Sequence, residues 1–291
     1  MMGTLRRIPL KLYLFAVPVV VMIVCAIFAP YIAPCDPIKG DLSERLRPPV
    51  WMDRGSAGHL LGTDHLGRDV LSRIIYGARI SLLVGLISSV MGATFGMCMG
   101  MLGGYFRGKV DAVITKIIDI QLAFPFLLFA ITVIAVLGPS LRNLLVILAI
   151  SGWVTYARIV RGQTLSLREK EFIEAARAIG CHPARVIMNH LLPNVVSYIL
   201  VIMTIEIGRL IVLESTMSFL GLGVQPPTPS LGMALADGKD YLITAWWLAT
   251  FPGLTIMVVV LCLNVLGDTA RDLLEPRTRR MGIKVEKEPT V

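Results

Sequence analysis

Charged residues are scarce in this chain. They make up 16% of the 291 residues, whereas hydrophobic residues make up 55% and the mean hydropathy is +0.72. An average soluble domain carries about 25% charged residues. The composition therefore excludes an ordinary water-soluble domain and predicts a protein embedded in a membrane.

Motifs for ligands and disulfides are also missing. The five cysteines form no Cys-x-x-Cys pair and the four histidines show no His-Glu-x-x-His spacing, so neither a disulfide framework nor a metal or other cofactor is expected on this chain. The Gly-Lys of GYFRGKV, residues 104–110, lacks the leading spacing and the following Ser or Thr of a phosphate-binding loop. We therefore expect no catalytic residues and no ATPase on this chain.

The net charge is +8, but the sequence contains no basic patch interleaved with aromatic residues. Nucleic acid is for that reason not an expected partner. The basic residues cluster beside apolar runs, where contact with membrane lipid and control of membrane orientation explain them better.

Long uncharged runs predict an all-α membrane protein with about six transmembrane helices, since roughly 20 residues cross a hydrocarbon core of about 30 Å. The expected spans are Leu12–Ile32, Ile80–Tyr105, a third that ends at Gly138 with a kink at Pro125, Asn143–Ala157, Val195 to about Leu220, and about Tyr241–Gly267. Basic residues before the first span and after the last predict that both termini are cytoplasmic.

Three further patterns indicate how these spans pack and where they begin. Four glycines at four-residue intervals predict a helix-packing seam: Gly92, Gly96, Gly100 and Gly104. The pair Trp246–Trp247 is expected to anchor the last span at the outer interface. Val70–Ala78 has an apolar face opposite Arg68, Ser72 and Arg73, which suggests an amphipathic helix at the membrane surface. The alternative is a plain connection into the next span, which we favour over a substrate site.

The polar stretch between the fourth and fifth spans, residues 171–194, carries a distinct pattern. Its order is Glu-Ala-Ala, then Gly180, then Leu192-Pro193, which predicts two short helices with a break between them. Phe172, Ile173, Ala176 and Ile179 can share one apolar face of the first helix. A helical elbow that projects from a membrane protein suits docking into a groove on another protein.

This loop resembles the signature loop of bacterial ABC importer permeases, and the likeness extends over most of the chain. The other matching stretches are LGTDHLGRDVLSRIIYGARISL at 61–82, GYFRGKVDAVITKIIDIQLAFP at 104–125, SFLGLGVQPPTPSLG at 218–232, FPGL at 251–254 and LGDTARDLLEPR at 266–277. Together they resemble the C-type permease subunit of the dipeptide, oligopeptide and nickel branch.

The resemblance implies a type I ABC importer permease fold in the bacterial cytoplasmic, or inner, membrane, with a cytoplasmic coupling helix. The implied partners are a homologous second permease, two ATP-binding subunits or domains that hold ATP and Mg²⁺, and an extracytoplasmic solute-binding protein. The residues that the resemblance implies for coupling to the ATPase are Glu171, Glu174, Ala175, Ala176, Gly180, Leu192 and Pro193.

The chain then divides into an N-terminal region with the first span and an outer segment, residues 1–79, and a permease core, residues 80–277. A cytoplasmic tail at 278–291 is expected to be disordered.

Ionisable residues inside the fifth span are candidates for the translocation path, because such groups at membrane depth usually face a cavity or one another. They are Glu206, Arg209 and Glu214. Glu206 and Arg209 are three residues apart, so an ion pair is an equally good interpretation. The two glutamates suit the cationic end of a peptide.

Dipeptides or oligopeptides are the expected substrates, with nickel, glutathione or cationic peptides as alternatives. A secondary transporter is the rival of another class, but it would show inverted repeats, and no convincing internal repeat is present. A membrane-embedded enzyme would need a nucleophile and base at catalytic spacing within the spans.

Overall fold

The computed structural model describes residues 10–274, and the expected tail at 278–291 lies outside that part. Within it the chain is helical and contains no β-strand. The helices are α1 (Leu10–Ile27), α2 (Ala29–Ile32), η1 (Leu42–Glu44), α3 (Val70–Phe106), α4 (Gly108–Ala123), α5 (Phe126–Leu137), α6 (Leu141–Arg168), α7 (Glu171–Ala178), α8 (Pro183–Val186), η2 (Ile187–Leu191), α9 (Leu192–Phe219), α10 (Leu231–Gly238), η3 (Lys239–Tyr241) and α11 (Trp247–Leu274).

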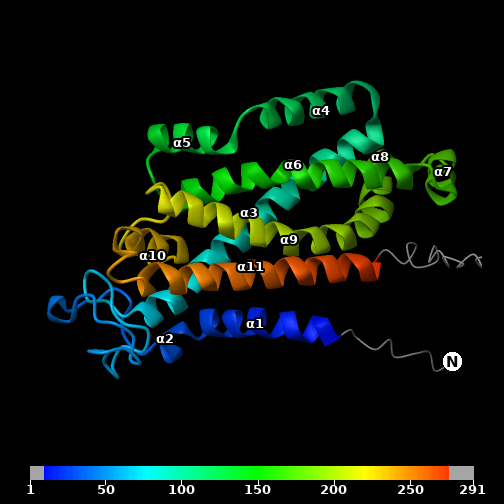
Figure 1. Cartoon of the computed structure of the whole chain (residues 1–291). Helices are drawn as coiled ribbons and strands as arrows, with labels where there is room; N and C mark the ends of the chain where they lie inside the picture. The colour runs from blue at the N-terminus through cyan, green and yellow to red at the C-terminus, as the bar shows by residue number, and fades with distance from the viewer. Residues whose placement is uncertain (1–9, 275–291) are drawn as a thin grey trace, which may run out of the picture.

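The long helices form a bundle with two distinct ends (Figure 1). One end, here called the α7 end, holds α7 and α8, the start of α1 and the end of α11. The opposite end, the α10 end, holds α2, α10 and the segment between α2 and α3. The first residue of α1 and the last residue of α11 therefore lie at the same end of the bundle as the helical elbow, residues 171–194.

Four helices in the described part are long and apolar enough to cross a membrane: α3, α6, α11 and the continuous helical stretch Pro183–Phe219. The pair α4 and α5 makes a fifth span if it is counted as one, and α1 holds a shorter apolar helix, Tyr13–Ile27. The all-α membrane fold with about six spans is therefore confirmed.

The expected kink at Pro125 is confirmed as a sharp break. α4 ends at Ala123, α5 starts at Phe126, and the two helices are bent by 87°. Proline lacks an amide hydrogen and restricts the residue before it to extended conformations, so helix α4 cannot continue through Phe124.

Helix α3 is longer than the predicted second span. Val70–Ala78 continues into it without a break, so this stretch leads directly into the span and does not form a separate helix. Ser72 and Arg73 are buried together with the apolar face, because α3 has neighbours on both sides here. The side chain of Asp69 caps the helix by accepting a hydrogen bond of 2.7 Å from the Ser72 amide. The boundary that we placed after residue 79 falls inside α3.

The expected aromatic anchor is only half correct. Trp246 is 38% exposed, but Trp247 is buried, and its indole nitrogen donates a hydrogen bond to the Thr63 carbonyl. Trp247 thus fixes the start of α11 against the segment that leads into α3.

The glycine seam of α3 is confirmed, and its partner is α6. A Cβ atom at Gly92 would lie 3.0 Å from the Ala149 carbonyl oxygen, and one at Gly104 would lie 2.7 Å from Cβ of Thr164. Gly96 and Gly100 approach the turns of α6 between those two points. Close backbone contact replaces the hydrophobic effect as a source of association between helices in lipid.

Gly100→Val should destabilise the bundle by about 1–3 kcal/mol, because overpacking at a tight contact costs that much. A Cβ at residue 100 would lie 2.6 Å from the Ala157 carbonyl oxygen and 2.8 Å from Cβ of Val160. Thermal unfolding of the purified protein in detergent measures the effect. The matched control is Gly162→Val on α6, where no atom lies within 4 Å of the added Cβ; an equal loss in both variants would contradict the seam.

Candidate functional site

The elbow has the two-helix form that the sequence predicts. α7 ends at Ala178, and Gly180 follows with φ +79°, a left-handed conformation that favours glycine. The Cys181 amide donates to the Ala176 carbonyl at 3.1 Å, which closes the end of α7. His182 then caps α8 by accepting a hydrogen bond from the Ala184 amide at its Nδ1 atom.

Only part of the apolar face of the elbow is buried. Ile173 and Ala176 are buried, but Phe172 is 44% exposed and Ile179 is 80% exposed. Ile179 follows the last residue of α7, so the helix no longer turns it toward the bundle. Two large apolar side chains thus remain uncovered on the surface of a charged loop.

The elbow is held to the bundle by an apolar cluster. Ile173, Val186 and Leu191 are fully buried in it, next to Tyr156 and Val160 of α6 and residues of α3 and α9. Burial of such side chains is worth about 1.5–3 kcal/mol each. A force applied to the elbow is therefore transmitted to three long helices at once.

The predicted coupling residues lie together at the α7 end. Glu171, Glu174, Ala175 and Gly180 are exposed, and Ala176 faces the bundle. Leu192 and Pro193 lie where the π-helical turn Ile187–Leu191 passes into α9, and this irregular turn accommodates a proline that has no amide hydrogen to donate.

Glu206 and Arg209 form the predicted ion pair. Nη2 of Arg209 lies 2.8 Å from Oε2 of Glu206, and the arginine also donates a hydrogen bond of 3.4 Å to Ser151 of α6. The Glu206 side chain is largely buried, while 40% of the Arg209 side chain is exposed. A cavity of about 260 Å³ lies between α6, α9 and α11 beside this pair, and Gln163 and Arg271 line it together with Glu206.

Glu214 lies in a separate environment, enclosed by hydroxyl groups. It is fully buried. Its Oε2 accepts a hydrogen bond of 2.9 Å from Ser81 of α3, and its Oε1 accepts one of 2.8 Å from Ser218. These contacts connect α9 to α3, and they leave Glu214 away from the cavity beside Glu206 in this conformation.

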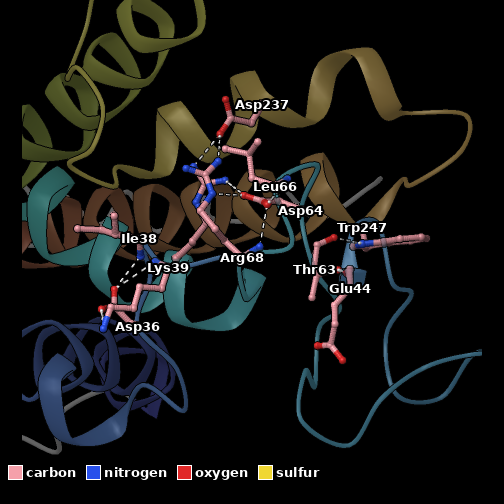
Figure 2. Close-up of polar contacts among 11 residues, drawn as sticks. Asp36, Ile38, Lys39, Glu44, Thr63, Asp64, Leu66, Arg68, Asp237 and Trp247 are labelled. Carbon is pink, nitrogen blue, oxygen red and sulfur yellow. Dashed lines mark hydrogen bonds and ion pairs between the residues drawn. The ribbon is translucent and has the colours of Figure 1, made fainter. Parts of the chain in front are cut away.

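An ion cluster at the α10 end was not predicted (Figure 2). Arg73 donates to Asp64 at 2.5 Å and to Asp237 of α10 at 2.7 Å, and Arg68 contacts the same two carboxylates at 2.6 and 3.1 Å. No local pattern indicates that Asp237 joins residues so distant in sequence. The charges of two arginines at the α10 end are therefore neutralised within the protein.

The arginines also govern the acidity of Asp64. Burial raises its pKa, but the charge of Arg73 and the hydrogen bonds and charge of Arg68 outweigh burial, so the pKa of Asp64 lies below its usual value. The carboxylate is therefore held in its charged form.

Comparison with known proteins agrees with these features. The family described as "Binding-protein-dependent transport system inner membrane component" matches residues 68–280. The di/tripeptide transport system permease protein DppC of Pseudomonas aeruginosa is 41% identical over 258 residues, 89% of this chain and 85% of the relative. The glutathione transport system permease protein GsiD of Pectobacterium atrosepticum is 40% identical over 261 residues, 90% of this chain and 85% of the relative.

A solved structure shares the fold. The MetNI methionine ABC transporter in an inward-facing conformation matches with a TM-score of 0.56 and 20% sequence identity, covering 69% of this chain and 95% of that chain. At that identity the match speaks for the architecture alone.

Asp64→Asn should lower the free energy of unfolding near neutral pH by on the order of 3 kcal/mol, because it breaks a buried ion pair. The change is measured as a lower melting temperature. Because the folded pKa is lowered, the stabilisation is complete above the usual value of about 3.9 and is lost as the pH falls through the lower folded pKa. The difference from wild type should thus shrink below about pH 4. Asp53→Asn, an exposed carboxylate, is the control; a difference that stays constant with pH would refute the assignment.

Proposed function

The chain belongs to the family of binding-protein-dependent transport system inner membrane components, and on that premise we propose that it is the permease subunit of an ATP-driven importer for dipeptides and oligopeptides. The observation that carries the proposal is the elbow at the α7 end. It combines a rigid apolar attachment to the bundle with exposed Phe172 and Ile179. Such a surface suits a cleft on a cytoplasmic ATP-binding subunit.

The orientation of the chain follows from its charges. Arginine and lysine residues crowd the elbow and the adjacent end of α6, and an excess of such residues is typical of cytoplasmic loops. On this basis the α7 end faces the cytoplasm, both termini are cytoplasmic, and the α10 end faces outward.

The elbow would act as a lever. When the ATP-binding subunits approach each other, they would displace α7 and α8 together, because Ile173 and Val186 share one apolar cluster. The same cluster includes residues of α3, α6 and α9, so the displacement would alter the cavity beside Glu206. ATP and Mg²⁺ belong to the partner subunits in this scheme.

The remaining partners complete the path. The spans of one chain line half of a path, so a homologous second permease is needed for the other half. An extracytoplasmic solute-binding protein would deliver the substrate at the α10 end. Within this chain Glu206 and Arg209 are the proposed path residues, since Glu206 lines the cavity and Arg209 pairs with it. Glu214 would reach the path only after α3 and α9 separate.

Glutathione is the second candidate substrate. The supporting observation is the 40% identical relative named as a glutathione permease, whose identity is almost equal to that of the di/tripeptide permease. Nickel and cationic peptides remain alternatives from the sequence resemblance. Because glutathione is itself a modified tripeptide, the ion pair of Glu206 and Arg209 suits both substrate classes.

Glu174→Lys should uncouple ATP hydrolysis from transport while the protein still reaches the membrane, because it reverses a charge on the exposed face of α7. Uptake of labelled dipeptide into proteoliposomes that hold the whole complex should fall at least about ten-fold, while ATP hydrolysis continues. Asp53→Lys makes the same charge change in the segment between η1 and α3, far from the elbow in sequence, and should leave ATPase coupling intact.

Gly180→Val should have a similar effect for a conformational reason. No atom lies within 4 Å of an added Cβ, so the substitution causes no clash within the chain but strains the backbone at φ +79°. Gly180→Asn should retain more activity, because asparagine tolerates this conformation better. Unchanged transport in Glu174→Lys and in Gly180→Val would remove the elbow from the mechanism.

Glu206→Gln should impair uptake of peptides without preventing assembly, because it removes the charge beside the cavity. Glu214→Gln should mainly lower thermal stability, since it weakens a buried hydroxyl cage that joins α3 to α9. Uptake rate and melting temperature of each reconstituted complex separate the two effects. Normal uptake in both variants, with normal assembly, would contradict a path role for this helix.

A further inference from the structure

Three potential metal ligands converge at the α10 end, although they are far apart in sequence. Cys35 follows α2, His59 lies in the segment before α3, and Asp69 is the residue that caps α3. One donor atom from each side chain lies within 4.8 Å of the other two. The separations of 24 and 10 residues match no metal-binding motif, so the sequence predicted no such site.

The imidazole of His59 is oriented from both sides. Its Nε2 atom lies 2.8 Å from Oε2 of Glu44, and its Nδ1 atom lies 3.0 Å from Oδ1 of Asp69. A carboxylate on the far ring nitrogen is the usual arrangement for a metal-bound histidine, because it fixes the tautomer and makes the near nitrogen a better ligand. Two ligands of one tetrahedral zinc ion, each about 2.0–2.2 Å from it, stand roughly 3.3–3.6 Å apart. The Nδ1 and Oδ1 atoms, now at hydrogen-bond distance, would therefore separate by a few tenths of an ångström on binding zinc.

The other two ligands are also fixed by their surroundings. Oδ2 of Asp69 accepts hydrogen bonds of 2.7 Å from the amide and the hydroxyl of Ser72, which leaves Oδ1 for a ligand. The Ser72 hydroxyl in turn accepts a hydrogen bond of 3.0 Å from the Cys35 amide. One serine thus positions both the carboxylate and the backbone that carries the thiol.

The charge of the site favours a cation. Within the described residues no arginine or lysine pairs with Asp69, and the nearest basic contact is Arg47, 3.5 Å from the other oxygen of Glu44. Burial raises the pKa of the Cys35 thiol, and the charges of Asp69 and Glu44 raise it further. A divalent cation would replace this repulsion by attraction and stabilise the thiolate.

A second cluster at the same end provides a contrast. Asp64, His65 and Asp237 also bring three donor atoms within 4.8 Å of one another. Two arginines already pair with its carboxylates, Arg68 and Arg73, so a further cation would be repelled. The contrast singles out the cluster around His59.

We propose that Cys35, His59 and Asp69 bind one divalent cation of the zinc class, with a fourth position open to water. Sulfur and nitrogen donors favour zinc and similar borderline metals over Mg²⁺ or Ca²⁺, which prefer oxygen. The ion would fasten the segment between α2 and α3 to the first turn of α3.

Metal binding to the purified full-length protein tests the proposal. After treatment with a chelator and equilibration with Zn²⁺, the wild type should retain about one zinc ion per chain. Cys35→Ser and His59→Gln should each weaken binding by at least about ten-fold, and Glu44→Gln should weaken it by about ten-fold as well. Cys98→Ser and His65→Gln are the matched controls, because Cys98 lies in α3 away from the α10 end and His65 lies in the neutralised cluster.

Two further readouts guard against misfolded variants. Co²⁺ bound to the wild type should show a thiolate-to-cobalt charge-transfer band that is lost in Cys35→Ser. In the unaltered protein, Zn²⁺ should slow alkylation of Cys35, mapped by mass spectrometry, and leave the rate at exposed Cys98 unchanged. Absence of stoichiometric zinc in the wild type, full retention in both ligand variants, or equal alkylation with and without Zn²⁺ would overturn the proposal.

Discussion

The close contact between α3 and α6 is the constraint on which the rest of the bundle depends. Glycines on α3 bring its backbone against α6 over about three turns, and this contact needs no hydrophobic driving force within lipid. The opposite side of α3 is thereby free to pack against α1 and α9, and its first turn reaches α10. α3 is thus the axis that connects the segment at the α10 end to the apolar cluster beneath the elbow.

The two ends of the bundle are built from different interactions. At the α7 end, apolar burial attaches the elbow while its charged and apolar outer face stays open to a partner. At the α10 end, charged groups join distant segments, as in the contacts of Arg73 with Asp64 and Asp237. The first arrangement suits transmission of force, and the second holds a loop-rich segment in one conformation.

Local patterns predicted much of this architecture. The spans, the break at Pro125, the glycine seam and the two helices of the elbow each depend on neighbouring residues, so the sequence was sufficient to locate them. The failures concern tertiary contacts: Trp247 is buried by a segment far from it in sequence, and Ile179 is exposed because α7 ends one residue earlier. The cluster at Asp237 and the ligands around His59 were missed for the same reason, since only the fold brings them together.

Crosslinking tests most directly whether the elbow contacts an ATP-binding subunit. A photoreactive residue in place of Ile179, in the complex in native membranes, should crosslink to an ATP-binding subunit, and the yield should change with ATP. Position 179 is 80% exposed, so the probe need not disturb the bundle. Crosslinks to lipid alone, in membranes where the chain still transports its substrate, would contradict the account.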